Sequence, residues 1–177
     1  MEKGKIMRTL FDELELNTEN DVVKKEDKFN KSSFRFVDSL IINDACELHF
    51  DIFEKNGALF ASIRKYVHSK KYTGPTKNGI TVRKKVLKEI INIIEQNRFR
   101  IISSKEEVEL GHVEKNSITN IVISLRESTV DNNPLCLDIR EYKNSSYYKG
   151  PTKKGFRISI DQVNDFVKCC YHILEKL

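Results

Sequence analysis

Basic side chains are concentrated in one stretch of the sequence, residues 55–88, which contains no aspartate or glutamate. Its ten cations are Lys55, Arg64, Lys65, Lys70, Lys71, Lys77, Arg83, Lys84, Lys85 and Lys88. A weaker cluster comprises Lys143, Lys149, Lys153, Lys154 and Arg157. Among these cations stand Tyr66, Tyr72, Tyr142, Tyr147 and Tyr148. Cations can follow a chain of phosphates, and aromatic rings stack on unpaired bases at about 1–3 kcal/mol each. A duplex hides its base faces, so the pattern predicts a single-stranded nucleic acid as ligand.

The two clusters belong to an internal repeat, because residues 59–82 align without a gap on residues 135–158 at an offset of 76. Eleven of the 24 aligned positions are identical, far more than the one or two expected by chance, which indicates a duplication. The identical pairs are Leu59/Leu135, Ile63/Ile139, Arg64/Arg140, Tyr66/Tyr142, Ser69/Ser145, Tyr72/Tyr148, Gly74/Gly150, Pro75/Pro151, Thr76/Thr152, Lys77/Lys153 and Gly79/Gly155.

Each repeat has the hydrophobic pattern of several strands followed by one helix. Apolar residues alternate at 46–52, 59–63 and 121–125, a period typical of strands, and earlier strands are predicted at 34–37 and 108–113. The Gly-Pro-Thr-Lys-x-Gly segments at 74–79 and 150–155 predict turns that return the chain into the sheet at 80–82 and 156–158. The period then becomes helical, with apolar faces formed by Val86, Leu87, Ile90, Ile91 and Ile94, and by Val163, Phe166, Val167, Cys170 and Leu174. Ser159 and Gln162 have the spacing of a capping box before the second helix.

These patterns predict an α+β protein built from a charged flexible tail (1–33), a first strand-rich repeat with its helix (34–97) and a second one (98–177). A unit of this size with one sheet and one helix leaves apolar surface uncovered. We therefore expect the two repeats to complete one another as an intramolecular pseudo-dimer, with the helices packed together and the sheets splayed outward. The spacing of apolar residues at 10–14 in the tail is also consistent with a short docking helix for transcription or replication proteins.

The alternative interpretation is that these residues have only a structural role, with the charges on a solvated face and the strand tyrosines packed against their neighbours. Recurrence of Arg64/Arg140 and Lys77/Lys153 beside Tyr66/Tyr142 favours binding, because outward polar positions drift after a duplication unless something retains them. We expect Arg64, Lys77, Arg140 and Lys153 to hold phosphates. The residues expected to stack on bases are Phe53, Tyr66, Tyr72, Tyr142 and Tyr148.

Residues 135–170 closely resemble the positive cofactor four family of single-stranded DNA-binding transcriptional coactivators. The resemblance lies in the Asp-Ile-Arg-Glu-Tyr strand at 138–142 and the Lys-Lys-Gly-Phe-Arg-Ile strand at 153–158 that leads into a helix. Residues 34–96 resemble the family more loosely, so the chain would carry two tandem copies. The resemblance implies curved antiparallel sheets of about four strands, each with a C-terminal helix, dimerisation through the helices and DNA lying across the strands.

Carried over by position, the resemblance implies contacts from Phe53, Lys55, Arg64, Tyr66 and Lys77 in the first copy and from Arg140, Tyr142 and Lys153 in the second. The basic residues Lys65, Lys70, Lys71, Lys149 and Lys154 complete the predicted binding set. Two departures stand out. Val67 and Lys143 replace a tryptophan common in the family, and Thr129 and Asp131 stand at the offset of Phe53 and Lys55. We therefore expect the halves to bind unequally, with the first copy stronger.

Other classes of function are less consistent with the sequence. A nuclease would need clustered carboxylates or a nucleophile with its base, and none of the four histidines recurs in the other copy. We expect no catalysis, no metal and no cofactor; Cys169 and His172 are an incomplete metal pair. A protein-interaction scaffold of the transcription machinery and a single-stranded RNA binder remain open. Without an apolar run of about 18 residues or a signal-peptide core, the protein is expected to be intracellular, with no membrane partner. The expected location is the nucleus or another site of transcription or replication, of a cell or of a virus.

Overall fold

The computed structural model describes residues 34–128 and 134–177. The predicted tail and its docking helix lie outside these residues. The first four strands are β1 (Arg35–Asn43), β2 (Cys46–Lys55), β3 (Ala58–His68) and β4 (Thr73–Val82), followed by helices α2 (Lys84–Gln96) and α3 (Arg98–Ser103). The second half contains β5 (Val108–Asn116), β6 (Thr119–Glu127), β7 (Leu135–Asn144), β8 (Lys149–Ser159), a short 3-10 turn (Ile160–Gln162) and α4 (Val163–Leu174). The described residues form one compact unit.

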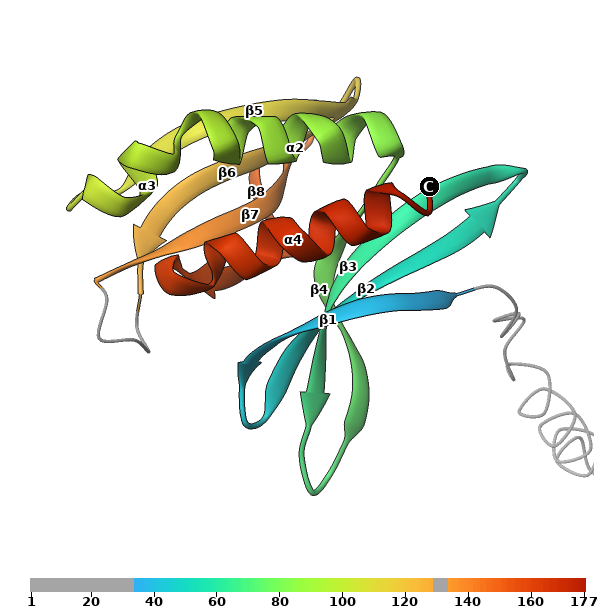
Figure 1. The fold of residues 1–177 in the computed structure, drawn as a ribbon. Helices are drawn as coiled ribbons and strands as arrows, with labels where there is room; N and C mark the ends of the chain where they lie inside the picture. Colours follow the sequence, from blue (N-terminus) through green and yellow to red (C-terminus); the bar gives the residue numbers. More distant parts are fainter. Residues whose placement is uncertain (1–33, 129–133) are drawn as a thin grey trace, which may run out of the picture. The chain divides into compact units, whose positions relative to one another are not determined.

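The strands form two antiparallel four-stranded sheets, one in each repeat, ordered β1-β2-β3-β4 and β5-β6-β7-β8 (Figure 1). This confirms the predicted succession of strands and helix in both copies. Burial alternates along β2 as the sequence pattern predicts, with Cys46, Leu48, Phe50 and Ile52 buried. Both predicted helical faces are buried too, except that Val86 is only partly covered. The capping box is present, and the Ser159 amide donates to Gln162 Oε1 at 3.4 Å.

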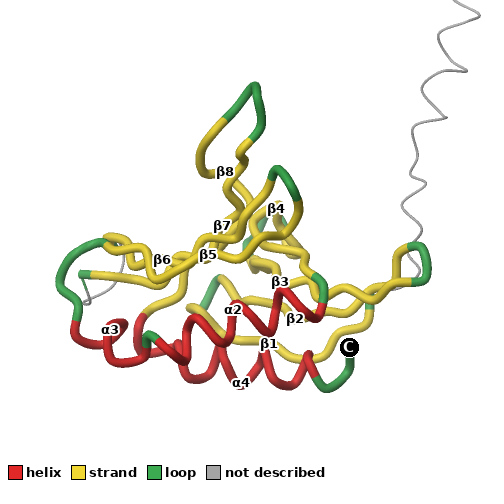
Figure 2. Tube along the Cα trace, turned by 90° about the horizontal axis from the view of Figure 1, so that it is seen from above, coloured by secondary structure: helices red, strands yellow, loops and turns green. Residues whose placement is uncertain are grey.

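Each helix contacts the sheet of the other repeat. Helix α2, which follows the first sheet in sequence, contacts β5 and β6, and α4, which follows the second sheet, contacts β1 and β2. The two helices also touch one another, and Figure 2 shows them side by side. Strands β4 and β8 are in direct contact between the sheets. One hydrophobic core therefore draws on both repeats.

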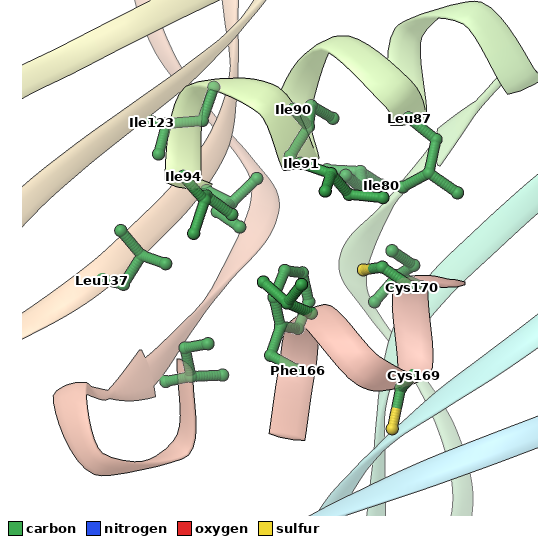
Figure 3. Close-up of a cluster of buried hydrophobic side chains, with 14 of the residues drawn as sticks. Ile80, Leu87, Ile90, Ile91, Ile94, Ile123, Leu137, Phe166, Cys169 and Cys170 are labelled. Carbon is green, nitrogen blue, oxygen red and sulfur yellow. The ribbon is translucent and has the colours of Figure 1, made fainter. Parts of the chain in front are cut away.

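The centre of this core is the ring of Phe166 on α4 (Figure 3). Its centroid lies 5.8 Å from that of Phe50 on β2 and 5.6 Å from that of Phe156 on β8. Ile80, Ile91 and Ile94 are among the buried aliphatic side chains of the same core. Phe166 thus connects the two sheets through a single side chain.

The predicted turn at the Gly-Pro-Thr-Lys-x-Gly segment is wrong. These residues belong to β4 and β8, and the reversal lies earlier, at residues 69–72 and 145–148. The glycines serve close packing instead. A Cβ on Gly79 would lie 2.5 Å from the Ile63 carbonyl oxygen, and one on Gly155 would lie 2.6 Å from that of Ile139. A register shift in each pairing accommodates the remaining residues of the segment as a bulge.

Candidate nucleic-acid interface

The outward face of the first sheet carries the side chains that alternate with the core. On β3 these are Phe60, Ser62, Arg64 and Tyr66, and on β2 they are Glu47, His49, Asp51 and Phe53. Strand pairing places Phe53 opposite Phe60 and His49 opposite Arg64. Two of the predicted stacking residues, Phe53 and Tyr66, therefore share one face with the predicted phosphate ligand Arg64.

Aromatic rings cross this face in two groups, which we call the aromatic row: Phe34, Phe36, His49, Phe53, Phe60 and Tyr66. The ring centroid of Phe53 lies 4.8 Å from Phe34 and 5.4 Å from Phe60. That of His49 lies 5.2 Å from Phe36 and 4.2 Å from Tyr66, on which it stacks with an interplanar angle of 12°. Phe34 and Phe36 remain 60% and 56% exposed. Such a surface offers π-faces to flat ligands.

Four members of the row, Phe34, Phe36, His49 and Phe60, were not among the predicted binding residues. Their positions follow from the pairing of β1 with β2 and of β2 with β3, which the sequence pattern alone does not fix. The alternation of β2 and β3 was the available signal, since it puts His49 and Phe60 on the face of Phe53. The basic cluster also reaches this surface, because the Arg83 guanidinium lies 5.6 Å from the centroid of Phe60.

Arg64 and Arg140 occupy equivalent places but differ in their partners. Each donates to a carbonyl oxygen on the next strand, Arg64 to Thr76 at 3.0 Å and Arg140 to Thr152 at 3.1 Å. Arg140 also donates twice to Asp138, at 2.8 and 3.0 Å, which raises the pKa of the guanidinium.

The first sheet has Ser62 at the place of Asp138. Among the described residues, the Ser62 hydroxyl is the buried side-chain polar atom without a hydrogen-bond partner, and no ion pair involves Arg64. Asp51 interacts electrostatically with Arg64 but forms no ion pair with it, so the charge of Arg64 is less compensated than that of Arg140.

Tyr72 and Tyr148 have a structural role in the β3–β4 and β7–β8 turns. The Tyr72 hydroxyl donates to the Pro75 carbonyl oxygen at 2.7 Å, and the Tyr148 hydroxyl donates to that of Pro151 at 2.5 Å. The amides of both tyrosines are held by the serine hydroxyl three residues earlier. Their rings are half exposed. The hairpin itself therefore accounts for the recurrence of these tyrosines, and of the serine and proline beside them.

The predicted lysines are distributed over several places. Lys70 and Lys71 lie exposed at the tip of the β3–β4 hairpin, and Lys55 lies exposed at the end of β2. Exposed positions on β4 and β8 hold Lys77, Lys149, Lys153 and Lys154. Lys65 alternates with Arg64 and Tyr66, so its side chain leaves the opposite face of β3. It does not share the surface of the aromatic row.

Lys65 instead lines a cleft of about 320 Å³ between the repeats. Arg140, Lys153 and Arg157 of the second repeat line the same cleft. Arg157 lies 3.6 Å from Asp138, the carboxylate that also holds Arg140. The structure thus brings Lys65 of the first repeat together with two predicted binding residues of the second, Arg140 and Lys153.

Apart from Tyr142, the described residues of the second sheet include no counterpart of the aromatic row. Strand pairing puts Arg126 and Cys136 at the places of Phe53 and Phe60, and Val122 at the place of His49. Arg126 pairs with Glu107 at 2.9 Å. Thr129 and Asp131, which the offset of 76 assigned to the places of Phe53 and Lys55, lie outside the described residues. Tyr142 alone represents the row on β7.

The comparisons with known proteins give no further guide, since no family model matches the chain and no curated protein matches it significantly.

Within residues 34–128 and 134–177, no helix is long and apolar enough to cross a membrane. In the same ranges, no three histidine, cysteine or acidic side chains are grouped as metal ligands would be. His172 Nδ1 lies 2.6 Å from Asp38 Oδ2, and the Cys169 thiol contacts the Ser39 carbonyl oxygen at 3.8 Å.

Proposed function

We propose that the protein binds single-stranded DNA without catalysis, through the outward face of its first sheet. The observation that carries this proposal is the aromatic row beside Arg64. Stacking on aromatic rings requires unpaired bases, and a cationic surround retains the phosphates. Arg83, Lys55 and the hairpin lysines supply further positive charge around the row.

The proposed process is transcription, in the manner of a coactivator, or DNA replication and repair. Its support is the resemblance of residues 138–142 and 153–158 to the positive cofactor four family. We further propose that the repeats form an intramolecular pseudo-dimer of such units. The exchange of helices between the sheets supports this, because each repeat uses the helix of the other to cover its own apolar face.

Binding is expected to be unequal between the repeats. The second sheet has Arg126 and Cys136 where the first has Phe53 and Phe60, and Asp138 partly neutralises Arg140. Fewer stacking faces and a compensated arginine both reduce the attraction for a single strand. The second sheet is therefore proposed as the weaker part of the surface.

The test is fluorescence anisotropy with a labelled single strand of about 20 nucleotides, its duplex and the matching RNA, over a salt series. We expect the single strand to bind more tightly than the duplex, with a log–log salt slope of about −0.7 per phosphate contact. Tyr66→Ala should weaken binding by about 5- to 150-fold, the loss of one stacked base. Tyr147→Ala is the matched control, since Tyr147 is 98% exposed and lies outside the row.

Equal affinity for single strand and duplex, or no effect of Tyr66→Ala, would contradict the proposed binding face. Tighter binding of the RNA would retain the face and change the ligand. Absence of binding at low salt would instead favour the protein-interaction alternative. Circular dichroism of Tyr66→Ala is needed beside these measurements, because the ring also stacks on His49.

A further inference from the structure

Two histidines on the proposed binding face converge on one carboxylate. His49 Nε2 and His68 Nε2 both lie 2.9 Å from Glu47 Oε1. His49 also stacks on Tyr66, and the centroid of His68 lies 5.2 Å from that of Tyr66. The side chains of Glu47, His49 and His68, which we call the histidine cluster, therefore surround a ring of the aromatic row.

We propose that the histidine cluster makes the affinity for single-stranded DNA depend on pH, with tighter binding as the pH falls from about 8 to about 5.5. This inference rests on the proposed function. With Glu47 ionised and both histidines neutral, the cluster has a charge of −1; with both histidines protonated, its charge is +1. A repulsive site for phosphates becomes an attractive one on the same face as Arg64.

Glu47 keeps its negative charge over this whole range. Hydrogen bonds, first from His49 and then from His68, outweigh the effect of burial and lower the pKa of Glu47 to about 2. The change in charge therefore comes from the imidazoles, the side chains that ordinarily titrate between about pH 5 and 8. Because a bound polyanion favours the protonated imidazole, proton uptake and DNA binding strengthen one another.

The other groups that face the cluster come from four strands. On β2, Asp51 interacts electrostatically with His49, and burial raises the pKa of Asp51. On β3, Arg64 pairs across the strands with His49. The residues that β1 and β4 contribute do not titrate. On β1, Ser39 lies against Glu47 and Phe36 against His49. On β4, the residues that pair with outward positions in the exposed half of β3 are Thr73, Pro75 and Gly79. Asp51 is thus the one other group here whose protonation could add positive charge.

The second sheet supplies a matched comparison. His112 on β5 lies 3.2 Å from Glu109, so it is also a histidine beside a carboxylate on an outward face. It has no aromatic ring in contact with it among the described residues. If the first sheet is the main binding face, protonation of His112 should change DNA affinity little.

The experiment is anisotropy of the full chain with oligothymidine, whose bases do not titrate in this range, at about pH 8 and about pH 5.5. We expect affinity to rise by roughly 2- to 30-fold at the lower pH, as for two exposed ion pairs. The salt slope should steepen by up to about 1.4, the contribution of two added phosphate contacts. Circular dichroism at both pH values confirms that the protein is folded.

The double variant His49→Gln/His68→Gln should abolish the affinity ratio between the two pH values, whereas His112→Gln should leave it unchanged. The ratio is the readout because His49→Gln also removes a ring from Tyr66 and can weaken binding at both pH values. If the wild-type protein binds equally at both pH values, the proposed role of the histidine cluster is wrong, while the proposed binding face is unaffected. A ratio that persists in the double variant would assign the effect to another titratable group, such as Asp51 or the His172–Asp38 pair, and overturn the proposal too. Absence of binding at both pH values would instead contradict the proposed function itself.

Discussion

Phe166 is the side chain whose loss should cost this fold most, because it connects both sheets. It lies fully buried on α4, against Phe50 of the first repeat and Phe156 of the second. Truncation of a buried phenylalanine to alanine costs about 3–5 kcal/mol through lost transfer energy and the cavity left behind. The two ring pairs supply part of this, about 0.5–1.5 kcal/mol each beyond their buried area. Against a total stability of about 5–15 kcal/mol for an ordinary domain, Phe166→Ala removes a large fraction.

The assay is urea and thermal unfolding of Phe166→Ala beside Phe99→Ala. Phe99 is the matched control, because it lies on α3 with 84% of its surface exposed and should change stability by less than about 0.5 kcal/mol. At about 2–4 °C per kcal/mol for a chain of this size, Phe166→Ala should lower Tm by roughly 6–20 °C. Because each helix covers the other repeat's sheet, wild type should unfold in one transition seen alike by all probes. A loss below about 1 kcal/mol, or separate transitions for the two repeats, would refute the shared core.

Two further predictions concern the strand register and the response to acid. Gly155→Ala should destabilise the fold by about 1–3 kcal/mol in urea unfolding. The reason is that the new Cβ would lie 2.6 Å from the Ile139 carbonyl oxygen and 2.8 Å from Arg140 Cα. A neutral result would mean that β7 and β8 separate easily. Glu47 has a folded-state pKa of about 2 against 4.5 in the unfolded chain, so its contribution to stability is complete above pH 4.5 and is lost as pH falls toward 2. Glu47→Gln should therefore flatten acid unfolding over this window, whereas Glu114→Gln, a change at an exposed carboxylate on β5, should not.

The hydrophobic pattern was sufficient to predict both sheets and both main helices. Period-two alternation in β2 and the helical faces of α2 and α4 identify the buried side chains almost residue by residue. In β6 the alternation identifies Ile121, Ile123 and Leu125 but misses Val122 and Ser124, which are buried as well. The choice of partner for each helix was not predictable in the same way. An apolar face indicates that a helix packs against something, but the sheets of both repeats offer a suitable aliphatic surface. Only the tertiary structure shows that each helix packs against the sheet of the other repeat.

The hairpin turn was mispredicted because proline and glycine have two uses. In a turn they set backbone angles, and in a strand they permit a bulge and a close approach. Gly79 and Gly155 serve the second use, since a side chain there would collide with the neighbouring strand. The residues that close the turn are Ser69 and Ser145, whose hydroxyls accept from the amides of Tyr72 and Tyr148. Their pattern is local hydrogen bonding, which composition does not reveal.

Retention and divergence between the repeats bear on different properties of the molecule. The retained pair Arg64/Arg140 donates to strand carbonyl oxygens, and Tyr72/Tyr148 closes the hairpin, so much of what recurs is needed for folding. Recurrence is therefore a weaker argument for binding than the sequence suggested. The aromatic row, apart from Tyr66, is the opposite case, because the second sheet replaces its other rings. Phe34 and Phe36 are too exposed to contribute much to the core that both repeats share. Exposed aromatic side chains kept on one sheet only are hard to explain by folding, which is why the proposed binding face is placed where the repeats differ.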